Sequence, residues 1–537
     1  MNFIGQWILL NLITLACAYP LSKYAFLVLQ KKVTARIDTR VFTFLGLNTA
    51  NMSWASYLSA LLQFQLLGWL LVYGLAFFQT GAKHYSADMA FQLASSYVTN
   101  TNWQVLAGEQ FWNLPLRLFG IITQNFFSAS TGLCVLLVFA RCFKGKNAPL
   151  GNFWQDIWRS TIYLLVPVSL LASLFLVSQG VPQNFKNDLH IAQYDSSQGL
   201  LQSIPMGPIA SEVSIKLLGN NGGSYTAANS AHPLENPTPC SHVFEMVMML
   251  LLSVMGCFLF ARIIGKTRCG WYIWLTMFIL VSLFTMGAHL TEPANLLGKE
   301  LRLGTTGAVM WHAITTGTST GATAAVIDQF QPLTYGFYLF LMNIGEIAYG
   351  GIGMGVVNIL FLFILSSFIL SLLTGTQPRF LRNHIPISAI KWSMLYIILL
   401  PCLTLILLIL MMVVFHLLRG VAMPKPYMLS AAWYAVSSWF NNNGSGFSAW
   451  VPDGPLMNYI SGLSMLVGRY IPITIAFVVS GIFAKELQLE TDNGGFDLDT
   501  TLFCMVNVFI ILIVTLLAFL PLWALGPLMA QGLITAL

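Results

Sequence analysis

The sequence has very little charge. Only 8% of its 537 residues are Asp, Glu, Lys or Arg, while 56% are apolar. A soluble protein needs about 25% charged residues because its surface faces water. The shortage excludes a soluble multidomain enzyme, a nucleic-acid-binding protein and a disordered scaffold. The net charge of +6 is small for this length, so the composition indicates a protein that crosses a membrane many times.

Several chemical signatures are also missing. The eight cysteines are scattered and include no CxxC pair, which excludes a disulfide-stapled secreted domain. None of the eight histidines forms a helix-spaced pair, so we expect no catalytic site and no metal other than a transported ion. There is no Asp-Lys-Thr-Gly phosphorylation motif and no soluble segment large enough for a nucleotide domain. We therefore expect a chain that is no enzyme by itself, binds no nucleotide and takes the energy for uphill transport from a partner.

The sequence does have long apolar runs. A bilayer core of about 30 Å needs about 20 apolar residues in a helix. Ten runs meet this length, near residues 7–30, 55–78, 119–142, 160–179, 243–264, 270–290, 334–374, 393–418, 456–483 and 502–525. The seventh run is too long for one straight helix and contains Gly350, Gly351, Gly353 and Gly355, which predicts one broken crossing. The first run lacks the flanks of a cleaved signal peptide. The predicted fold class is an all-α integral membrane protein with ten transmembrane helices.

The distribution of basic residues predicts the orientation. Lys and Arg are retained on the cytoplasmic side of a membrane. The loops after odd-numbered spans hold most of them: Lys31, Lys32, Arg36, Arg40, Arg141, Lys144, Lys146, Arg159, Arg262, Lys266, Arg268, Arg379, Arg382, Lys391 and Lys485. We therefore expect both termini to face outward.

The outward-facing loops share an internal pattern. Each contains a moderately apolar stretch, then a cluster of Asn, Gly, Thr or Ser, then a run rising into the next span. The clusters are Thr99–Gln104, Gly219–Ser224, Thr315–Gly321 and Asn441–Gly446, with half-length helices expected before them, for instance at 87–98 and 429–440. Recurrence at a fixed period indicates repeats. The expected units are a flanking span at 1–40, repeats at 41–145, 146–268, 269–390 and 391–490, and a last flanking span at 491–537.

Irregular backbone at membrane depth is tolerated only where it lines a cavity or is buried in protein. A loop that conducts a cation replaces the lost hydration with carbonyl oxygens, and glycine permits the unusual backbone angles this needs. Half-helices before the loops would direct the negative ends of their dipoles at the ion. Ordinary turns use the same residue types, but the recurrence of the cluster in each two-span unit favours a selectivity filter.

Three segments carry a family resemblance: Asn229-Ser-Ala-His-Pro-Leu-Glu-Asn-Pro-Thr238, Gly345-Glu-Ile-Ala-Tyr-Gly-Gly-Ile-Gly353 and Thr99-Asn-Thr-Asn-Trp-Gln104. Over essentially its whole length the chain resembles the potassium-binding A subunit of the bacterial Kdp potassium-transporting ATPase. The resemblance implies four span–pore helix–span repeats with one flanking helix at each end. It also implies K⁺ as the transported ion and three partners, namely a P-type ATPase B subunit, a C subunit and a small F subunit.

The same resemblance implies the filter residues. They are Thr99, Asn100, Thr101, Asn102, Asn221, Gly222, Gly223, Thr318, Ser319, Thr320, Gly321, Asn443, Gly444 and Ser445, with Gln104 supporting the first loop. The sequence departs from the family pattern at Ser224, Ser319 and Gly317, so the K⁺ affinity is not carried over. Because the first loop has no glycine, we expect only pseudo-fourfold symmetry.

Two ionisable residues fall inside spans, where charge is expensive and marks function. Glu346 begins the glycine-rich break, and Arg469 lies midway along the ninth run. We expect the two to pair below the filter and hold the break, with Gly350, Gly351 and Gly353, as a gate across the inward path. The resemblance implies the same gate. The competing interpretation is a buried pair that only fixes helix register.

The resemblance thus implies an ATP-driven K⁺ uptake subunit of the bacterial inner membrane, which captures K⁺ outside and passes it to the ATPase. A self-sufficient gated channel or a Trk/Ktr-like transporter is the alternative. A membrane enzyme acting on lipids would need a polar catalytic cluster at the interface, and the sequence offers none.

Overall fold

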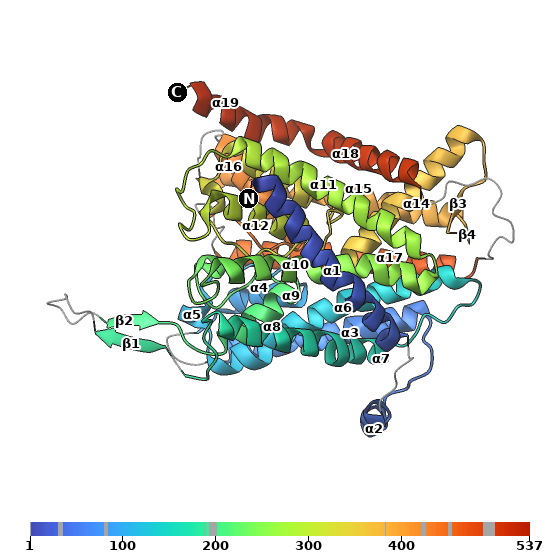
Figure 1. The fold of residues 1–537 in the computed structure, drawn as a ribbon, viewed down its shortest axis with the longest axis horizontal. Helices are drawn as coiled ribbons and strands as arrows, with labels where there is room; N and C mark the ends of the chain where they lie inside the picture. Colours follow the sequence, from blue (N-terminus) through green and yellow to red (C-terminus); the bar gives the residue numbers. More distant parts are fainter. Residues whose placement is uncertain are drawn as a thin grey trace.

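We analysed a computed structural model of the chain. The structure describes residues 2–30, 36–79, 84–186, 188–192, 201–381, 383–419, 426–448, 454–486 and 500–536. Figure 1 shows a bundle whose long helices run roughly side by side, with a small hairpin projecting from one end. The helices carry almost all of the regular structure, as the composition predicts.

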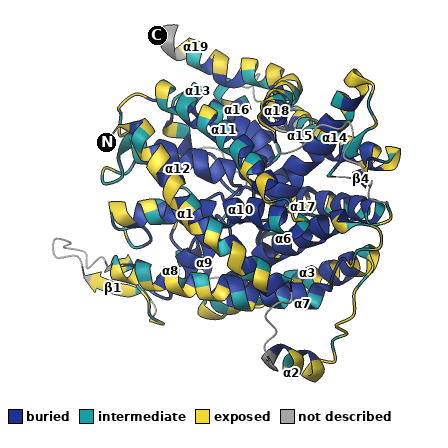
Figure 2. Cartoon of the chain, turned by 45° about the vertical axis from the view of Figure 1, so that its right-hand side comes forward, coloured by how far each residue is buried: buried dark blue, intermediate teal, exposed yellow. Residues whose placement is uncertain are grey.

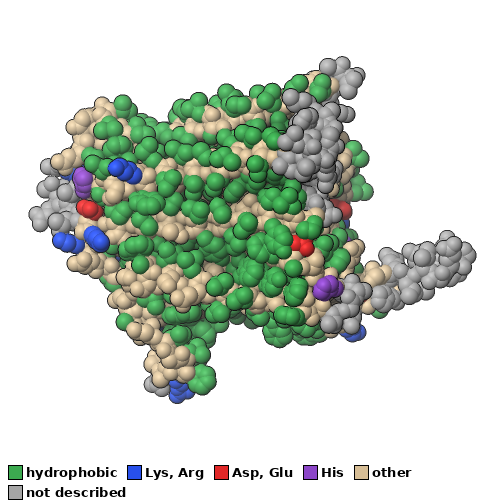
Figure 3. Space-filling view, turned by 180° about the vertical axis from the view of Figure 1, so that it is seen from behind, with side chains coloured by type: hydrophobic (Ala, Val, Ile, Leu, Met, Phe, Trp, Pro, Cys, Tyr) green, Lys and Arg blue, Asp and Glu red, His purple; other side chains and the backbone are tan. Residues whose placement is uncertain are grey.

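The described residues contain ten helical segments long and apolar enough to cross a membrane. They are Phe3–Leu29, Trp54–Phe77, Leu116–Lys144, Phe153–Ser178, Pro239–Ile264, Thr267–Thr291, Met354–Thr374, Ile387–Val413, Pro455–Phe483 and Thr501–Leu533. Each overlaps a predicted run, so the predicted count of ten spans is confirmed. Figure 3 shows apolar side chains covering the middle of one face, with charged side chains gathered toward its ends. This is the surface a bilayer requires.

The helices repeat the pattern span, half-helix, span. The first two units and their flanking helices comprise α1 (Phe3–Leu29), α2 (Arg36–Phe44), α3 (Trp54–Phe77), α4 (Ala87–Val98), α5 (Gly108–Phe111), a π-helical turn η1 (Leu116–Ile122) leading into α6 (Thr123–Arg141), η2 (Cys142–Lys144), α7 (Phe153–Arg159), η3 (Ser160–Leu165), α8 (Val166–Ser178), α9 (Ile209–Leu218), η4 (Asn229–Ala231) and α10 (Pro239–Ile264).

The last two units and the final flank comprise α11 (Thr267–Thr291), α12 (Gly304–Gly317), η5 (Ile327–Gln329), α13 (Pro332–Asn343), α14 (Met354–Thr374), α15 (Ile387–Arg419), α16 (Pro426–Phe440), α17 (Pro455–Phe483), α18 (Thr501–Trp523), η6 (Ala524–Leu528) and α19 (Met529–Ala536). The half-helices are α4, α9, α12 and α16. The seventh run is broken, as predicted, because α13 ends at Asn343 and α14 begins only at Met354.

Two short antiparallel hairpins lie at opposite ends of the bundle (Figure 1). Strand β1 (Leu189–Ala192) pairs with β2 (Leu201–Ile204), and β3 (Arg379–Phe380) pairs with β4 (Asn383–His384). Helix α1 begins at the end of the bundle that carries β1 and β2, and helix α19 finishes at that same end (Figure 1). Both termini therefore lie on one side, as the even number of spans requires.

The helix ends follow local chemistry. Thr238 caps α10 with a reciprocal hydroxyl–backbone pair to Ser241, and Pro239 occupies the first turn, where its missing N–H costs nothing. Gly265 ends the same helix in a left-handed conformation, with φ of 77°, which glycine adopts without strain. These signals fix where the span begins and ends.

The core of the bundle is formed by the inner span of each repeat. Figure 2 shows α6 and α10 almost wholly buried, whereas α1 and α3 carry many exposed residues. The exposed side chains on the outer helices are large and apolar, for example Leu66 and Leu67 on α3. In water such a surface would be unfavourable, so the outer helices are those that face lipid.

Some sequence predictions cannot be compared with the structure. Lys31, Lys32 and Arg382, three of the basic residues used for the orientation, lie outside the described residues. Of the others, Arg40 on α2 and Arg379 on β3 lie at the end of the bundle opposite to β1 and β2 (Figure 1).

Candidate ion-binding site

Each half-helix ends directly at one of the predicted polar clusters. Helix α4 ends at Val98, α9 at Leu218, α12 at Gly317 and α16 at Phe440. Each helix therefore directs its C-terminal carbonyls, which carry the negative end of the dipole, at the loop that follows it. The expected half-helix at 87–98 matches α4, and the one at 429–440 begins three residues earlier, at Pro426.

The four loops share a left-handed residue at the same position. The second residue of each is left-handed, with φ of 67° at Asn100, 48° at Asn220, 50° at Ser319 and 49° at Asn442. This register defines four equivalent loops, which we call ring loops 1 to 4: residues 99–102, 219–222, 318–321 and 441–444. The left-handed conformation was expected at glycine. Asn and Ser take it here, since short polar side chains tolerate it better than other residues.

The side chains of these left-handed residues join the ring loops in a closed circle. Asn100 Nδ2 donates to the Asn220 carbonyl of ring loop 2 at 2.7 Å. Asn220 Nδ2 donates to Thr320 Oγ1 of ring loop 3 at 2.9 Å, and Ser319 Oγ donates to the Asn441 carbonyl of ring loop 4 at 3.1 Å. Asn442 Nδ2 closes the circle by donating to Thr101 Oγ1 at 2.8 Å. Each ring loop is thus held by the one before it.

In ring loops 2, 3 and 4 the fourth residue packs against the next loop. A Cβ added to Gly222 would lie 2.5 Å from the Thr320 carbonyl oxygen, and one on Gly321 would lie 1.9 Å from that of Asn443. One on Gly444 would lie 1.9 Å from the Thr101 carbonyl oxygen. Only glycine fits at these three positions. Ring loop 1 has Asn102 instead, with φ of 56°, so the ring is only pseudo-fourfold, as the sequence predicts.

The ring loops also alternate in chemistry. In ring loops 1 and 3 two threonine hydroxyls, Thr99 with Thr101 and Thr318 with Thr320, lie 2.7 Å apart. In ring loops 2 and 4 an asparagine takes the third position, and Asn443 Nδ2 donates to the Thr315 carbonyl at 2.9 Å. None of the ring-loop residues carries a charge. The ring therefore offers only carbonyl, amide and hydroxyl oxygens to a ligand.

In two loops the predicted filter residues begin later in the chain than the ring loops do. The sequence predicted Asn221–Gly223 and Asn443–Ser445, but the register of the backbone begins ring loop 2 at Gly219 and ring loop 4 at Asn441. Asn220 and Asn442, two residues that close the circle, were missed. Each is the second residue after the end of its half-helix. Asn at such a position often adopts the left-handed backbone conformation, so this is the sequence signal that could have identified them.

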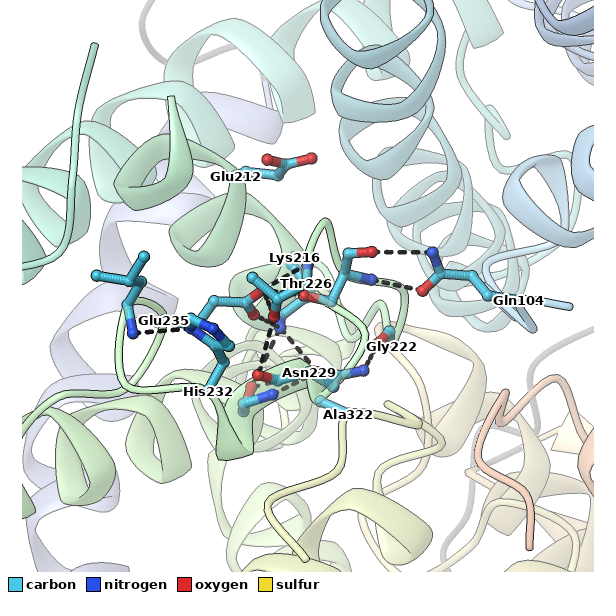
Figure 4. A network of polar contacts seen from close by, with 12 residues as sticks. Gln104, Glu212, Lys216, Gly222, Thr226, Asn229, His232, Glu235 and Ala322 are labelled. Atoms are coloured by element: carbon cyan, nitrogen blue, oxygen red, sulfur yellow. Dashed lines mark hydrogen bonds and ion pairs between the residues drawn. The ribbon is translucent and has the colours of Figure 1, made fainter. Parts of the chain in front are cut away.

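Gln104, which was expected to support the first loop, bonds to the segment that follows the second. Its side chain donates to the Ser224 carbonyl at 2.9 Å and accepts from the Ser224 N–H at 2.7 Å. Gln104 therefore ties the segment after ring loop 1 to the segment after ring loop 2 (Figure 4). A side-chain amide that pairs with both groups of a backbone unit fixes the spacing of the two segments.

The glycine-rich break between α13 and α14 lies against the inner spans and the end of α12. Its Gly350 N–H donates to the Gly317 carbonyl at 2.9 Å, and its Gly350 carbonyl accepts from Ser253 of α10 at 2.7 Å. A Cβ on Gly353 would lie 2.1 Å from the Gly132 carbonyl oxygen of α6. Glycine is required here because two backbones meet.

The predicted pair of Glu346 and Arg469 is not a salt bridge in the structure. Both residues are buried. Arg469 Nη2 instead donates to the Ser128 carbonyl of α6 at 3.3 Å, and Ser128 Oγ donates to Asn100 Oδ1 at 2.7 Å. The backbone of Glu346 is left-handed, with φ of 57°, and its carboxylate lies against Gly351 of the break. The two charges remain close enough to interact electrostatically.

The fold and the ring define a class of protein: a membrane transporter with four pore loops at a common centre. A search of solved structures supports the fold. The potassium transporter TrkH from Vibrio parahaemolyticus superposes with a TM-score of 0.54 over 89% of this chain and 98% of that chain, at 14% identity. At this identity the likeness concerns the fold alone.

Sequence comparisons identify the family. Residues 8–531 match the family model described as the potassium-transporting ATPase A subunit. A potassium-transporting ATPase potassium-binding subunit from Hydrogenobaculum sp. is 37% identical over 93% of this chain and 91% of its own. The protein of the same name from Serratia proteamaculans is 35% identical over 96% of both. The chain belongs to the family of potassium-transporting ATPase A subunits.

Proposed function

We propose that this chain is the potassium-binding, non-catalytic subunit of a K⁺-transporting ATPase and that it binds K⁺ within ring loops 1 to 4. The observation that carries the proposal is the closed circle of hydrogen bonds through Asn100, Asn220, Ser319 and Asn442. A circle fixes the distance between opposite loops, and that distance determines which ion the oxygens can surround.

The physical role of the ring is to replace the hydration shell of K⁺. Uncharged oxygens suit this task, because an ion must bind strongly enough to enter and weakly enough to leave. The four half-helices add a negative potential at the centre without adding an ionised group. The site residues proposed for this role are the predicted ones together with Gly219, Asn220, Asn441 and Asn442.

Below the ring, we propose that the break at Glu346–Gly353 closes the direct path to the cytoplasm, so that K⁺ passes to a partner. That partner would be the P-type ATPase B subunit, with a C subunit and a small F subunit completing the complex. Arg469 lies within reach of both the break and ring loop 1 and would couple the two. The likeness to TrkH does not favour a self-sufficient channel, because it concerns the fold alone.

Co-purification tests the assignment. The chain, tagged and co-expressed with a P-type ATPase subunit from the same organism, should copurify with it in detergent and confer ATP hydrolysis that K⁺ stimulates and Na⁺ does not. The matched control is the same ATPase subunit expressed alone. Potassium uptake restored in a deficient bacterium by this chain without any ATPase would instead support the channel alternative.

We also propose that the protein resides in the bacterial inner membrane with both termini outside. The ring and the β1–β2 hairpin would then face the outer solution, and α2 with β3–β4 the cytoplasm. A single cysteine introduced at Gly180, before β1, should react in intact cells with a membrane-impermeant maleimide. A cysteine at Gly375, before β3, should react only after lysis. The reverse pattern would overturn the orientation. No atom lies within 4 Å of a Cβ added at either glycine, but their φ values of 101° and 65° are strained for any other residue, so each cysteine variant must first be shown to copurify with the ATPase subunit.

A further inference from the structure

Half-helix α9 carries a buried cation that the ion-binding ring does not explain. Lys216 is a member of α9, and its side chain is 1% exposed. Its ammonium donates to Glu235 Oε2 at 2.8 Å, Asn229 Oδ1 at 3.0 Å and Ser230 Oγ at 3.1 Å. An ammonium has three protons, so Lys216 is fully used by residues of the segment that follows ring loop 2 (Figure 4).

Glu235 clamps the start of that segment. Its Oε1 accepts from the Ser224 hydroxyl, from the Thr226 hydroxyl at 2.5 Å and from the Thr226 N–H at 3.2 Å. Burial raises the pKa of Glu235, but the Lys216 ammonium and the two hydroxyls outweigh it, so that the pKa lies below its ordinary value. The carboxylate is therefore charged at neutral pH and can hold residues 224–226 in place.

Asn229 connects this ion pair to the ring itself. Its Oδ1 accepts from Lys216, and an ammonium can only donate, so the amide has one possible orientation. Its Nδ2 then faces ring loop 2 and donates to the Gly222 carbonyl at 2.7 Å. Lys216 thus determines which end of the Asn229 amide meets the ring.

This contact makes ring loop 2 unlike the others. Gly222 is the fourth residue of its loop, the position that Asn102, Gly321 and Gly444 occupy in theirs, but unlike those three it does not have a positive φ. Within the described part of the chain, those three carbonyls accept no hydrogen bond. Of the four carbonyls at the fourth position, only that of Gly222 is therefore held by a hydrogen-bond donor within the described residues. A held carbonyl cannot move inward to follow a smaller ion, and it shares its electron density with the donor.

Resting on the proposed function, we propose that Lys216, Asn229 and Glu235 are positioning residues for K⁺ selectivity. They fix and polarise the Gly222 carbonyl. They thereby set the width of the ring at its fourth residues and the strength of the electric field that an ion meets there. They contact no ion themselves and act only through that carbonyl. The signal was present in the sequence, in the Asn229–Thr238 segment that carries the family resemblance, but its role depends on Lys216, which only the fold brings to it.

The test uses the intact ATPase complex and two variants. Asn229→Asp keeps the shape and the Lys216 contact but replaces the donor to Gly222 by a carboxylate oxygen. Lys216→Met with Glu235→Gln removes both charges together and so leaves no unpaired ion. For both, we expect the K⁺ concentration for half-maximal ATP hydrolysis to rise about tenfold, as for a lost hydrogen bond at a charged network, with the maximal rate unchanged. The ratio of the half-maximal concentrations for K⁺ and Rb⁺ should also change.

The control is Lys299→Met with Glu292→Gln, another fully buried ion pair at 2.9 Å that contacts no ring residue. Unchanged half-maximal K⁺ and Rb⁺ concentrations in Asn229→Asp would overturn the proposal, as would an equal shift in the control. If the double variant does not assemble, Asn229→Asp decides alone, since it keeps both charges. Gly321→Asp is measured in parallel. If neither Asn229→Asp nor Gly321→Asp changes the K⁺ dependence, the proposed ion site is wrong. If only Gly321→Asp changes it, the ion site stands and only the proposed role of Lys216, Asn229 and Glu235 is overturned.

Discussion

Gly321→Asp is expected to abolish high-affinity K⁺ dependence. Gly321 has φ of 81°, and a Cβ there would lie 1.9 Å from the Asn443 carbonyl oxygen, so ring loops 3 and 4 must separate. Strain of this kind costs roughly 3 kcal/mol, which corresponds to about a hundredfold in affinity. We expect at least that increase in the K⁺ concentration for half-maximal ATP hydrolysis, and a smaller preference for K⁺ over Na⁺.

Two companion variants separate the ring from the rest of the fold. Gly223→Asp should have a similar effect, because a Cβ there would lie 2.1 Å from Tyr97 Oη of half-helix α4. Gly74→Ala on α3 is the control, since no atom lies within 4 Å of its added Cβ. Uptake at micromolar K⁺ that is unchanged in both aspartate variants would contradict the assignment of the ring.

The second large effect is expected at the break. Arg469→Met removes a buried guanidinium that holds the Ser128 carbonyl and leaves Glu346 buried without a nearby opposite charge. A buried carboxylate that loses a nearby opposite charge is destabilised, so the closed break should become less stable. We expect ATP-driven uptake to fall and passive K⁺ leak through the complex to rise about tenfold or more. Glu346→Gln should cause a smaller leak, because it removes the charge but keeps the size of the side chain.

Potassium efflux from liposomes that contain the complex, without ATP, measures this leak. Lys485→Met provides the control, since Lys485 is an exposed cation just after the same helix α17. Wild-type leak and uptake in both Arg469→Met and Glu346→Gln would show that the two charges only fix helix register.

Composition and periodicity determine most of the fold. The apolar runs predicted all ten spans because a bilayer sets one length for a helix that crosses it. The glycine-rich stretch predicted the break between α13 and α14. The recurring clusters predicted four loops after half-helices, because irregular backbone inside a membrane protein has few permitted places.

The details of the site could not be predicted in the same way. The pairing of Glu346 with Arg469 was inferred from the position of both charges inside spans and from the resemblance, whereas Arg469 is held by the Ser128 carbonyl of a third helix. The filter residues of ring loops 2 and 4 were carried over from the family resemblance and did not include Asn220 and Asn442, which adopt the left-handed conformation. Charge and residue type constrain what a residue can do, but they do not say which neighbour it meets.

The sequence by itself determined that this is a ten-span membrane protein of the potassium-transporting ATPase A subunit family, because hydrophobic length and local motifs are properties of contiguous residues. Only the tertiary structure decided how the loops join. Asn442 and Thr101 lie 341 residues apart in the chain, yet their side chains close the circle. Such a contact depends on how the repeats pack around one centre, and no local pattern in the sequence encodes that distance.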